Sequence, residues 1–147
     1  MKNNLNLDEL RRLEKTGEYL FHGSPDKDIQ ILEPRQAYTW INGEKTEDGD
    51  PGVAATPYLD IAIFRSLIQA GSQFSVDGDE LSFSATKEAQ EIAKNKVGYV
   101  YVLPRNFFKP KNGYPLAMDW RCEKNVKPIN IVEVQYKDLP KNIKLLP

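Results

Sequence analysis

The sequence predicts a single α+β domain whose sheets are largely antiparallel. Segments of strand-like composition outnumber helical ones, and several follow one another without a helix between them. A doubly wound fold would instead alternate strands with helices. The 147 residues contain no internal repeat, low-complexity tract or long linker. We therefore expect one domain over residues 1–147, with an N-terminal helix within residues 1–17.

Composition excludes several classes of protein. With 40% hydrophobic and 10% aromatic residues, the chain is too apolar for a disordered protein, and no apolar run approaches the roughly 18–20 residues that cross a bilayer. The N-terminus lacks the apolar core of a signal peptide, so we expect a cytoplasmic protein without membrane contact. Cys122 and His22 are the only cysteine and histidine, which excludes an internal disulfide, a multi-cysteine zinc site and a His-rich metal centre.

The charge is unevenly distributed along the chain. Residues 1–86 contain 8 Lys+Arg and 15 Asp+Glu, whereas residues 87–147 contain 12 and 6. A basic half can indicate contact with phosphates. Because the sequence has no nucleic-acid recognition motif and no arginine cluster, and its pI is about 5.9, we favour two halves of opposite charge that fold against each other.

The N-terminal segment predicts a helix followed by a strand. Asn6 is expected to cap a helix over Leu7–Lys15, with Gly17 just past its end. The apolar run Tyr19–His22 predicts a short strand, which stops at Gly23-Ser24-Pro25.

The next segment predicts a loop, a strand and a helix. Residues 36–52 are rich in Gly, Asp and Glu and predict a long loop, of the kind that often forms a functional lid. Val53–Ala55 predicts a short apolar strand. Thr56 and Pro57 are expected to open a helix, as N-cap and first helical residue, and Gly71 is expected to end it.

The following residues predict a hairpin and a further helix. Gln73–Val76 and Leu81–Ser84 are expected to pair around an Asp77-Gly78 turn. Thr86–Asn95 then predicts a modest helix.

Val97–Leu103 is the strongest strand prediction, because it is rich in β-branched and aromatic residues and stops at Pro104. Both faces are apolar, so we expect a central strand that is covered on both sides. The two-residue period places Val97, Tyr99 and Tyr101 on one face and Val100 and Val102 on the other. Ile129–Tyr136 predicts the last clear strand.

Several common catalytic motifs are absent from the sequence. There is no G-x-S-x-G nucleophile elbow, no G-x-x-x-x-G-K-[ST] phosphate loop and no G-x-G-x-x-G after a strand. A Ser–His or Cys–His pair could use only His22. These absences weaken a hydrolase or kinase interpretation.

The most informative segment is the strand end at His22 and Gly23. An imidazole at a sheet edge would lie beside a backbone that a ligand can approach closely, because glycine has no Cβ. An amide N–H and C=O side by side are the complement of a carboxamide. The alternative is that His22 hydrogen-bonds a loop while Gly23 supplies a turn.

The order of the other segments resembles the ADP-ribosyltransferase superfamily, in particular the small bacterial members that include the rifamycin-modifying transferases. The resemblance covers roughly residues 19–138. The segments that carry it are Phe21-His-Gly-Ser24, Leu32-Glu-Pro-Arg35, Gly52-Val-Ala-Ala-Thr56 before a helix with Asp60 and Ala62, Gly98–Pro104, and Trp120-Arg-Cys-Glu123 before Pro128–Val134. It implies two small packed antiparallel-rich sheets with flanking helices around an NAD cleft.

The resemblance also implies roles for individual residues. His22 would hydrogen-bond the adenine-side ribose of NAD, and the Gly23 backbone would bind the nicotinamide carboxamide. Ser24 stands where family members often place a hydroxyl near the ribose, and Arg35 would pair with the pyrophosphate. NAD would be a substrate, and no metal is implied.

Two parts of the implied site remain open. Many family members have an aromatic residue in the second strand, where this chain has Ala54-Ala55; Tyr58 and Tyr38 are the candidate substitutes. The carboxylate that would stabilise a cation-like transition state is either Glu123, which we slightly favour, or Asp119.

The predicted function is therefore binding of NAD and transfer of ADP-ribose to an acceptor, which is a protein, a nucleic acid or a small molecule. One alternative is a non-catalytic nucleotide- or protein-binding module of the same fold. The other is an RNA 2′-phosphotransferase-like enzyme. That family places an Arg directly before its His, where this chain has Phe21.

Overall fold

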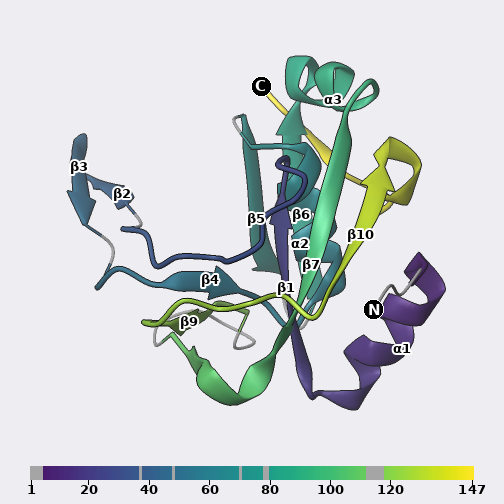
Figure 1. Cartoon of the computed structure of the whole chain (residues 1–147). Coiled ribbons are helices and arrows are strands. Elements are labelled where there is room, and N and C mark those ends of the chain that lie inside the picture. Colours follow the sequence, from purple (N-terminus) through teal and green to yellow (C-terminus); the bar gives the residue numbers. More distant parts are fainter. Residues whose placement is uncertain (1–4, 37, 48, 70, 78–79, 112–117) are drawn as a thin grey trace.

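The central sheet of the molecule is built around β7 (Val97–Pro104), which lies between β1 (Tyr19–Ser24) and β10 (Asn130–Gln135) and runs antiparallel to both (Figure 1). The computed structural model describes residues 5–36, 38–47, 49–69, 71–77, 80–111 and 118–147. The predicted central position of the strand at residues 97–103 is confirmed.

The two faces of β7 are buried in two different hydrophobic clusters. Val100 and Val102 belong to the larger cluster, beneath the helix α2 (Leu59–Leu67). Tyr101 and Leu103 belong to the second cluster, on the opposite face of the sheet. Double-sided burial is thus confirmed for residues 100–103, whereas Val97 at the start of the strand is 39% exposed.

The helix α1 (Leu7–Thr16) has the predicted N-terminal signal. The Asn6 side chain accepts from the backbone N–H of Glu9, and the Glu9 carboxylate accepts from the Asn6 N–H, which forms a capping box. Gly17 follows in the left-handed conformation with φ of 72°. The helix extends one residue beyond the predicted Lys15.

Helix α2 begins at Leu59, so the prediction of Pro57 as its first residue is wrong. Thr56 does not cap the helix; its hydroxyl accepts from the backbone N–H of Tyr58. The Glu14 carboxylate of α1 instead accepts from the Leu59 N–H at 2.7 Å. A distant carboxylate therefore satisfies the N-terminus of α2 and complements its positive end.

The predicted hairpin forms from β5 (Ser72–Asp77) and β6 (Glu80–Thr86). Asp77, which was predicted to lie in the turn, is instead the last residue of β5 and pairs with Glu80, and Gly78 lies outside the described residues. Thr86 caps α3 (Lys87–Ala93) by accepting from the Ala89 N–H. β11 (Lys144–Leu146) adds to β6 in parallel, a pairing that the sequence analysis did not predict.

A third sheet contains β4 (Val53–Ala55), β9 (Trp120–Cys122) and β8 (Lys109–Pro110), in the order β4-β9-β8. Short 3₁₀ turns, η1 (Arg105–Phe107) and η3 (Tyr136–Asp138), follow β7 and β10.

Residues 36–52 are not simply a loop, because they contain the hairpin of β2 (Tyr38–Ile41) and β3 (Glu44–Glu47). Its turn is Asn42-Gly43, and both residues have positive φ, which is typical of a two-residue hairpin. Figure 1 shows this hairpin as an arm that projects away from the rest of the molecule. Instead of two sheets, the described residues form three three-stranded sheets and this two-stranded arm.

Two hydrogen bonds join the central sheet to the sheet that contains β4. Phe21 N–H donates to the Thr56 carbonyl at 2.8 Å, and Thr56 N–H donates to the Phe21 carbonyl at 2.9 Å. Further along, Arg35 and Gly52 exchange a similar pair at 3.2 and 3.0 Å. The first bridge holds β1 beside the end of β4, and the second holds the segment after β1 beside the residue that precedes β4.

Replacing Gly23 with Ala should destabilise the protein by at least about 2 kcal/mol, in the range of an overpacked core. A Cβ at this position would lie 1.9 Å from the backbone carbonyl oxygen of Ala62 in α2, which cannot move without shifting the helix. Chemical denaturation monitored by circular dichroism measures the change. The matched control is Gly52→Ala, whose Cβ would have its nearest neighbour at 3.4 Å; equal stability of both variants would contradict the packing argument.

Candidate active site

The backbone of Gly23 points toward the edge of the sheet that faces β4. Opposite residues of an antiparallel pair alternate between exchanging two hydrogen bonds and exchanging none. Phe21 directs its N–H and C=O to Thr56, and its partner Val102 accepts from Ile129 on the β10 side. Two residues further, Gly23 therefore also directs its N–H and C=O away from β7 and toward the β4 edge.

The missing side chain of Gly23 makes room for α2, not for a ligand. The space a Cβ would occupy is taken by the Ala62 carbonyl. The expectation that an absent Cβ lets a ligand approach this residue is thus corrected: the open side is the backbone edge. That edge still offers a donor and an acceptor side by side, the arrangement that a primary carboxamide complements.

His22 lies on the opposite face of β1 from the α2 packing, next to Tyr101. Its Nδ1 lies 2.7 Å from the Ala54 carbonyl oxygen, which can only accept, so Nδ1 carries a proton and donates. Burial lowers the pKa of the imidazole, the Ala54 carbonyl opposes this, and the charges of Arg65 and Arg35 lower the pKa further. In the resulting neutral ring, Nε2 is a hydrogen-bond acceptor.

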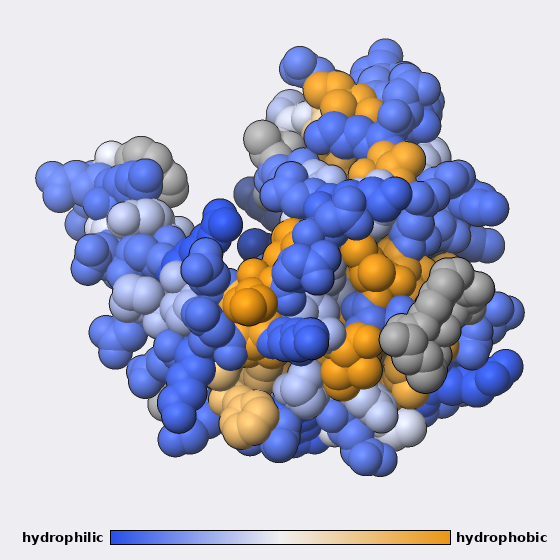
Figure 2. All heavy atoms as spheres, in the orientation of Figure 1, coloured by the Kyte–Doolittle hydropathy of each residue, from blue (hydrophilic) through white to orange (hydrophobic). Residues whose placement is uncertain are grey.

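Two cavities meet at His22. The main cavity, about 320 Å³, lies between β1, β4, α2 and β5 and includes His22, Gly23 and Arg65 in its lining. The side cavity, about 300 Å³, includes His22, Ser24 and Arg35. Figure 2 shows the hollow between the arm and the body of the molecule, with apolar side chains along its inner wall.

Asp119 and Arg121 form a bidentate ion pair at the main cavity. Arg121 Nε and Nη2 donate to the two Asp119 carboxylate oxygens, each at 2.8 Å, and both side chains are largely buried. Arg121 of β9 lies opposite Ala54 of β4 in the strand register. Arg121 lines both cavities. The pair fixes the carboxylate and leaves each of its oxygens a further lone pair.

The structure brings six of the eight predicted site residues to these cavities. His22, Gly23, Tyr38 and Asp119 line the main cavity, and His22, Ser24 and Arg35 line the side cavity. The Ser24 hydroxyl accepts from the Asp26 N–H and so also holds the turn after β1. Tyr38 is 49% exposed, and the Lys45 ammonium lies 4.3 Å from its ring centroid.

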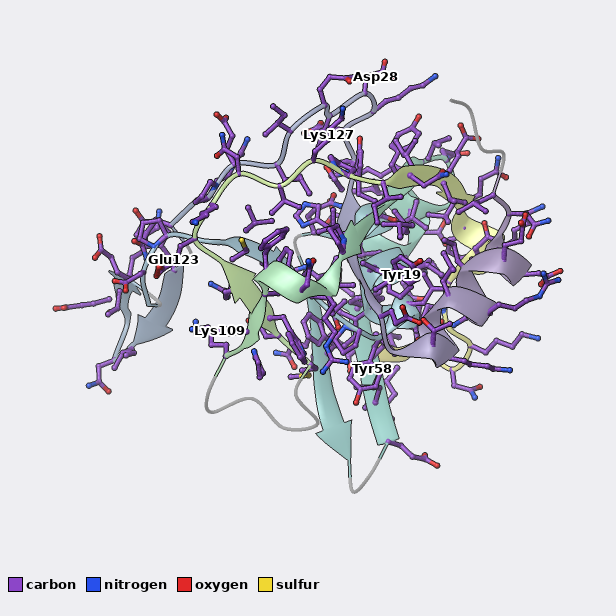
Figure 3. All side chains as sticks on the ribbon, turned by 60° about the horizontal axis from the view of Figure 1, so that its bottom comes forward. Tyr19, Asp28, Tyr58, Lys109, Glu123 and Lys127 are labelled. Atoms are coloured by element: carbon purple, nitrogen blue, oxygen red, sulfur yellow. The ribbon has the colours of Figure 1, made fainter. Side chains whose placement is uncertain are left out.

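Tyr58 and Glu123 line neither cavity. Tyr58 packs against the larger core cluster at the start of α2, whereas Glu123 is exposed beyond the end of β9. Figure 3 shows the two residues far apart. Of the two candidate aromatic residues and the two candidate carboxylates, Tyr38 and Asp119 are therefore the ones that line the main cavity, although Glu123 was slightly favoured from the sequence.

Two further arginines, Arg65 and Arg121, line the main cavity although no role was predicted for them from the sequence. Arg65 lies one turn after Ala62 on the helix face that lines the main cavity, a position that the 3.6-residue helical period indicates. Arg121 lies in the quoted Trp120–Glu123 segment, two residues after Asp119, and the two-residue strand period places both on one face.

Comparison of the chain with protein-family models, curated proteins and solved structures finds no match. The resemblance to ADP-ribosyltransferases stays a prediction from the motifs. Among the described residues, no helix combines the length and apolar character needed to cross a membrane. The same part of the chain contains no cluster of three or more His, Cys, Asp or Glu side chains suited to a metal ion.

The pKa of His22 should lie below its ordinary value near 6.5, which NMR can measure without ambiguity because the chain has one histidine. Between the folded-state pKa and about 6.5 the unfolded chain binds more protons, so stability rises with pH in this window and is lost as pH falls through it. Arg65→Gln should raise the pKa by removing a nearby positive charge. A titration at or above 6.5 in the parent protein would contradict the burial of the neutral ring.

Proposed function

We propose that the cleft formed by the main and side cavities binds NAD and transfers ADP-ribose to an acceptor. The observation that carries the proposal is the pairing of a neutral, oriented His22 with the Gly23 backbone edge, at the point where the two cavities meet. Each of the two cavities can hold one half of an extended dinucleotide.

His22 supports recognition of a ribose. Its Nδ1–H is used by the Ala54 carbonyl, so Nε2 accepts from a sugar hydroxyl. The lowered pKa keeps that acceptor available at neutral pH. A hydroxyl that donates to Nε2 is held in one orientation, because the ring itself is held by the backbone of β4.

The Gly23 edge supports recognition of the nicotinamide carboxamide. The Gly23 N–H complements the carboxamide oxygen, and the Gly23 carbonyl complements the carboxamide NH₂. Tyr38 lines the same cavity and can stack on the flat nicotinamide ring. Phe74 and Met118 complete an apolar wall for that ring.

The arginines support recognition of the pyrophosphate. Arg35 lies in the side cavity, Arg65 in the main cavity and Arg121 in both. The charges of Arg35 and Arg65 both act on His22, so these guanidinium groups are close to the meeting point of the cavities. When each nucleoside of NAD occupies one cavity, the pyrophosphate between them lies in that region, where the guanidinium groups can pair with its negative charge.

The proposed reaction breaks the bond between nicotinamide nitrogen and ribose C1′. The bonding electrons leave with nicotinamide, which becomes neutral, and positive charge develops on the ribose. Asp119 is the carboxylate at the main cavity that stabilises this charge. An acceptor nucleophile then bonds to C1′ and releases its proton, which gives the ADP-ribosylated product and nicotinamide.

An RNA 2′-phosphotransferase-like activity is the second candidate, because that family uses additional cleft arginines and three arginines line these cavities. Against it, Phe21 stands before His22 and is fully buried in the core. Incubation with NAD and 2′-phosphorylated RNA separates the two activities, since only the second removes the RNA phosphate.

His22→Ala should weaken NAD binding about three- to tenfold, as expected for the loss of one hydrogen bond to a bound sugar. Isothermal titration calorimetry measures the affinity. Tyr58→Phe, at a predicted site residue outside the cavities, is the control and should bind like the parent. No binding by the parent, or unchanged binding by a folded His22→Ala variant, would overturn the site.

Asp119→Asn should lower kcat for nicotinamide release about 100-fold with little change in NAD affinity, because the lost charge acts mainly in the transition state. Glu123→Gln removes the same charge outside the main and side cavities and should keep the parental rate of nicotinamide release. The assay is nicotinamide release followed by chromatography. Loss of activity in Glu123→Gln alone would restore Glu123 as the carboxylate, and NAD binding without turnover by the parent would favour a binding module.

A further inference from the structure

A third cavity, of about 570 Å³, adjoins the proposed NAD cleft. It is lined by residues from the end of the 36–52 segment, from η1 and β8, and from the end of β9. Arg121 lines this cavity as well as the main and side cavities. We call it the basic cavity because of the lysines around it, which are Lys109, Lys111 and Lys124.

The basic cavity concentrates positive charge from one stretch of sequence. Residues 105–127 contain six Lys and Arg but two Asp and Glu. Of the two acidic residues, Asp119 is already paired with Arg121. Glu123 and Asp50 line the basic cavity and offset part of its charge, so the three lysines leave it positive. Figure 3 shows Lys109 and Glu123 on the same side of the molecule.

An exposed aromatic ring lies beside these lysines. Phe107 lines the basic cavity and is 66% exposed, among the most exposed large apolar side chains in the described chain. Its neighbours hold it there: Phe108 is buried and its N–H donates to the Arg105 carbonyl at 2.9 Å, and the Arg105 guanidinium lies 4.4 Å from the Trp120 ring centroid. The short turn η1 therefore presents the Phe107 ring from a fixed base.

A flat exposed ring beside flexible ammonium groups is the combination that binds single-stranded nucleic acid. Bases stack on aromatic side chains, and lysines neutralise the phosphates between them. A double helix hides its base faces and could use only the lysines. We propose that the basic cavity binds single-stranded nucleic acid, with a base on Phe107 and phosphates at Lys109 and Lys124.

The position of the basic cavity suggests that the bound single-stranded nucleic acid is the acceptor of ADP-ribose. Because Arg121 lines both this cavity and the NAD cleft, a bound strand lies next to the site where ADP-ribose would be released. This role as acceptor rests on the proposed transferase function, whereas binding of the strand does not.

Binding is tested by fluorescence anisotropy with a labelled oligodeoxythymidylate of about twelve nucleotides, within the usual site size. Phe107→Ala should weaken binding at least about fivefold, as expected for a lost stacking contact. Lys109→Gln and Lys124→Gln should each weaken binding. Lys141→Gln removes the same charge at an exposed position that does not line the cavity and should remain within about twofold of the parent.

Salt dependence separates the two kinds of contact. Each lysine variant should reduce the slope of log affinity against log salt by about 0.7, the value for one phosphate contact on a single strand. Phe107→Ala should weaken binding without changing the slope. An equally long duplex should bind less tightly than the single strand and should be insensitive to Phe107→Ala. Thermal melting checks that every variant is folded.

Three results would overturn the proposal: no binding by the parent, cavity variants that behave like Lys141→Gln, or loss of affinity in the lysine variants without any effect of Phe107→Ala. The last would indicate general attraction of polyanions. NAD calorimetry on the same Phe107→Ala protein keeps the two proposals distinct. Unchanged NAD binding with weakened strand binding supports a separate surface, and strand binding without any NAD binding leaves only the transferase proposal refuted.

Discussion

The pair of hydrogen bonds between Phe21 and Thr56 is the connection on which the candidate site depends. It joins β1 of the central sheet to the end of β4, and so brings two sheets together at one point. Because the bonds occupy the backbone of Phe21, the next residue along that edge, Gly23, is left at the mouth of the cleft. The same junction places the Ala54 carbonyl within 2.7 Å of His22. The junction between Phe21 and Thr56 therefore sets the orientation and tautomer of the His22 ring as well as the position of the Gly23 backbone edge.

Local signals in the sequence predicted the elements whose ends are fixed by their own residues. Asn6 caps α1 as expected, with Glu9 three residues away as its partner. The helix predicted from Thr86 begins at Lys87, and Thr86 is its N-cap through the nearby Ala89 N–H. The start of α2 was misplaced because its cap is a carboxylate 45 positions away, Glu14. The arm was missed for another reason: its first strand, Tyr38–Ile41, is strand-like, but the strand after the Asn42-Gly43 turn, Glu44–Glu47, has no apolar residue, and the whole segment is rich in Gly, Asp and Glu.

The candidate site was predictable where motif and strand period agree. His22 and Gly23 end a strand, and both lie at the cleft. The carboxylate was ambiguous because Asp119 and Glu123 are four residues apart around β9, and both fit an alternating pattern. In the structure β9 ends at Cys122, Glu123 beyond it is exposed and lines neither the main nor the side cavity, and Asp119 lines the main cavity. The position of Tyr58 could not be predicted from the sequence, because its partial burial against the larger core cluster depends on tertiary packing.

Two different constraints act on Gly23. Its backbone edge faces the cleft, while its side-chain direction is closed by the Ala62 carbonyl. Any side chain there damages the packing of α2, so no substitution can alter recognition at this residue while leaving the fold intact. We therefore expect no substitution at position 23 to leave the stability of the protein unchanged. Variation in the shape of the cleft is therefore expected at its exposed walls, such as the arm that carries the half-exposed Tyr38, and the constraint on Gly23 is a consequence of helix packing.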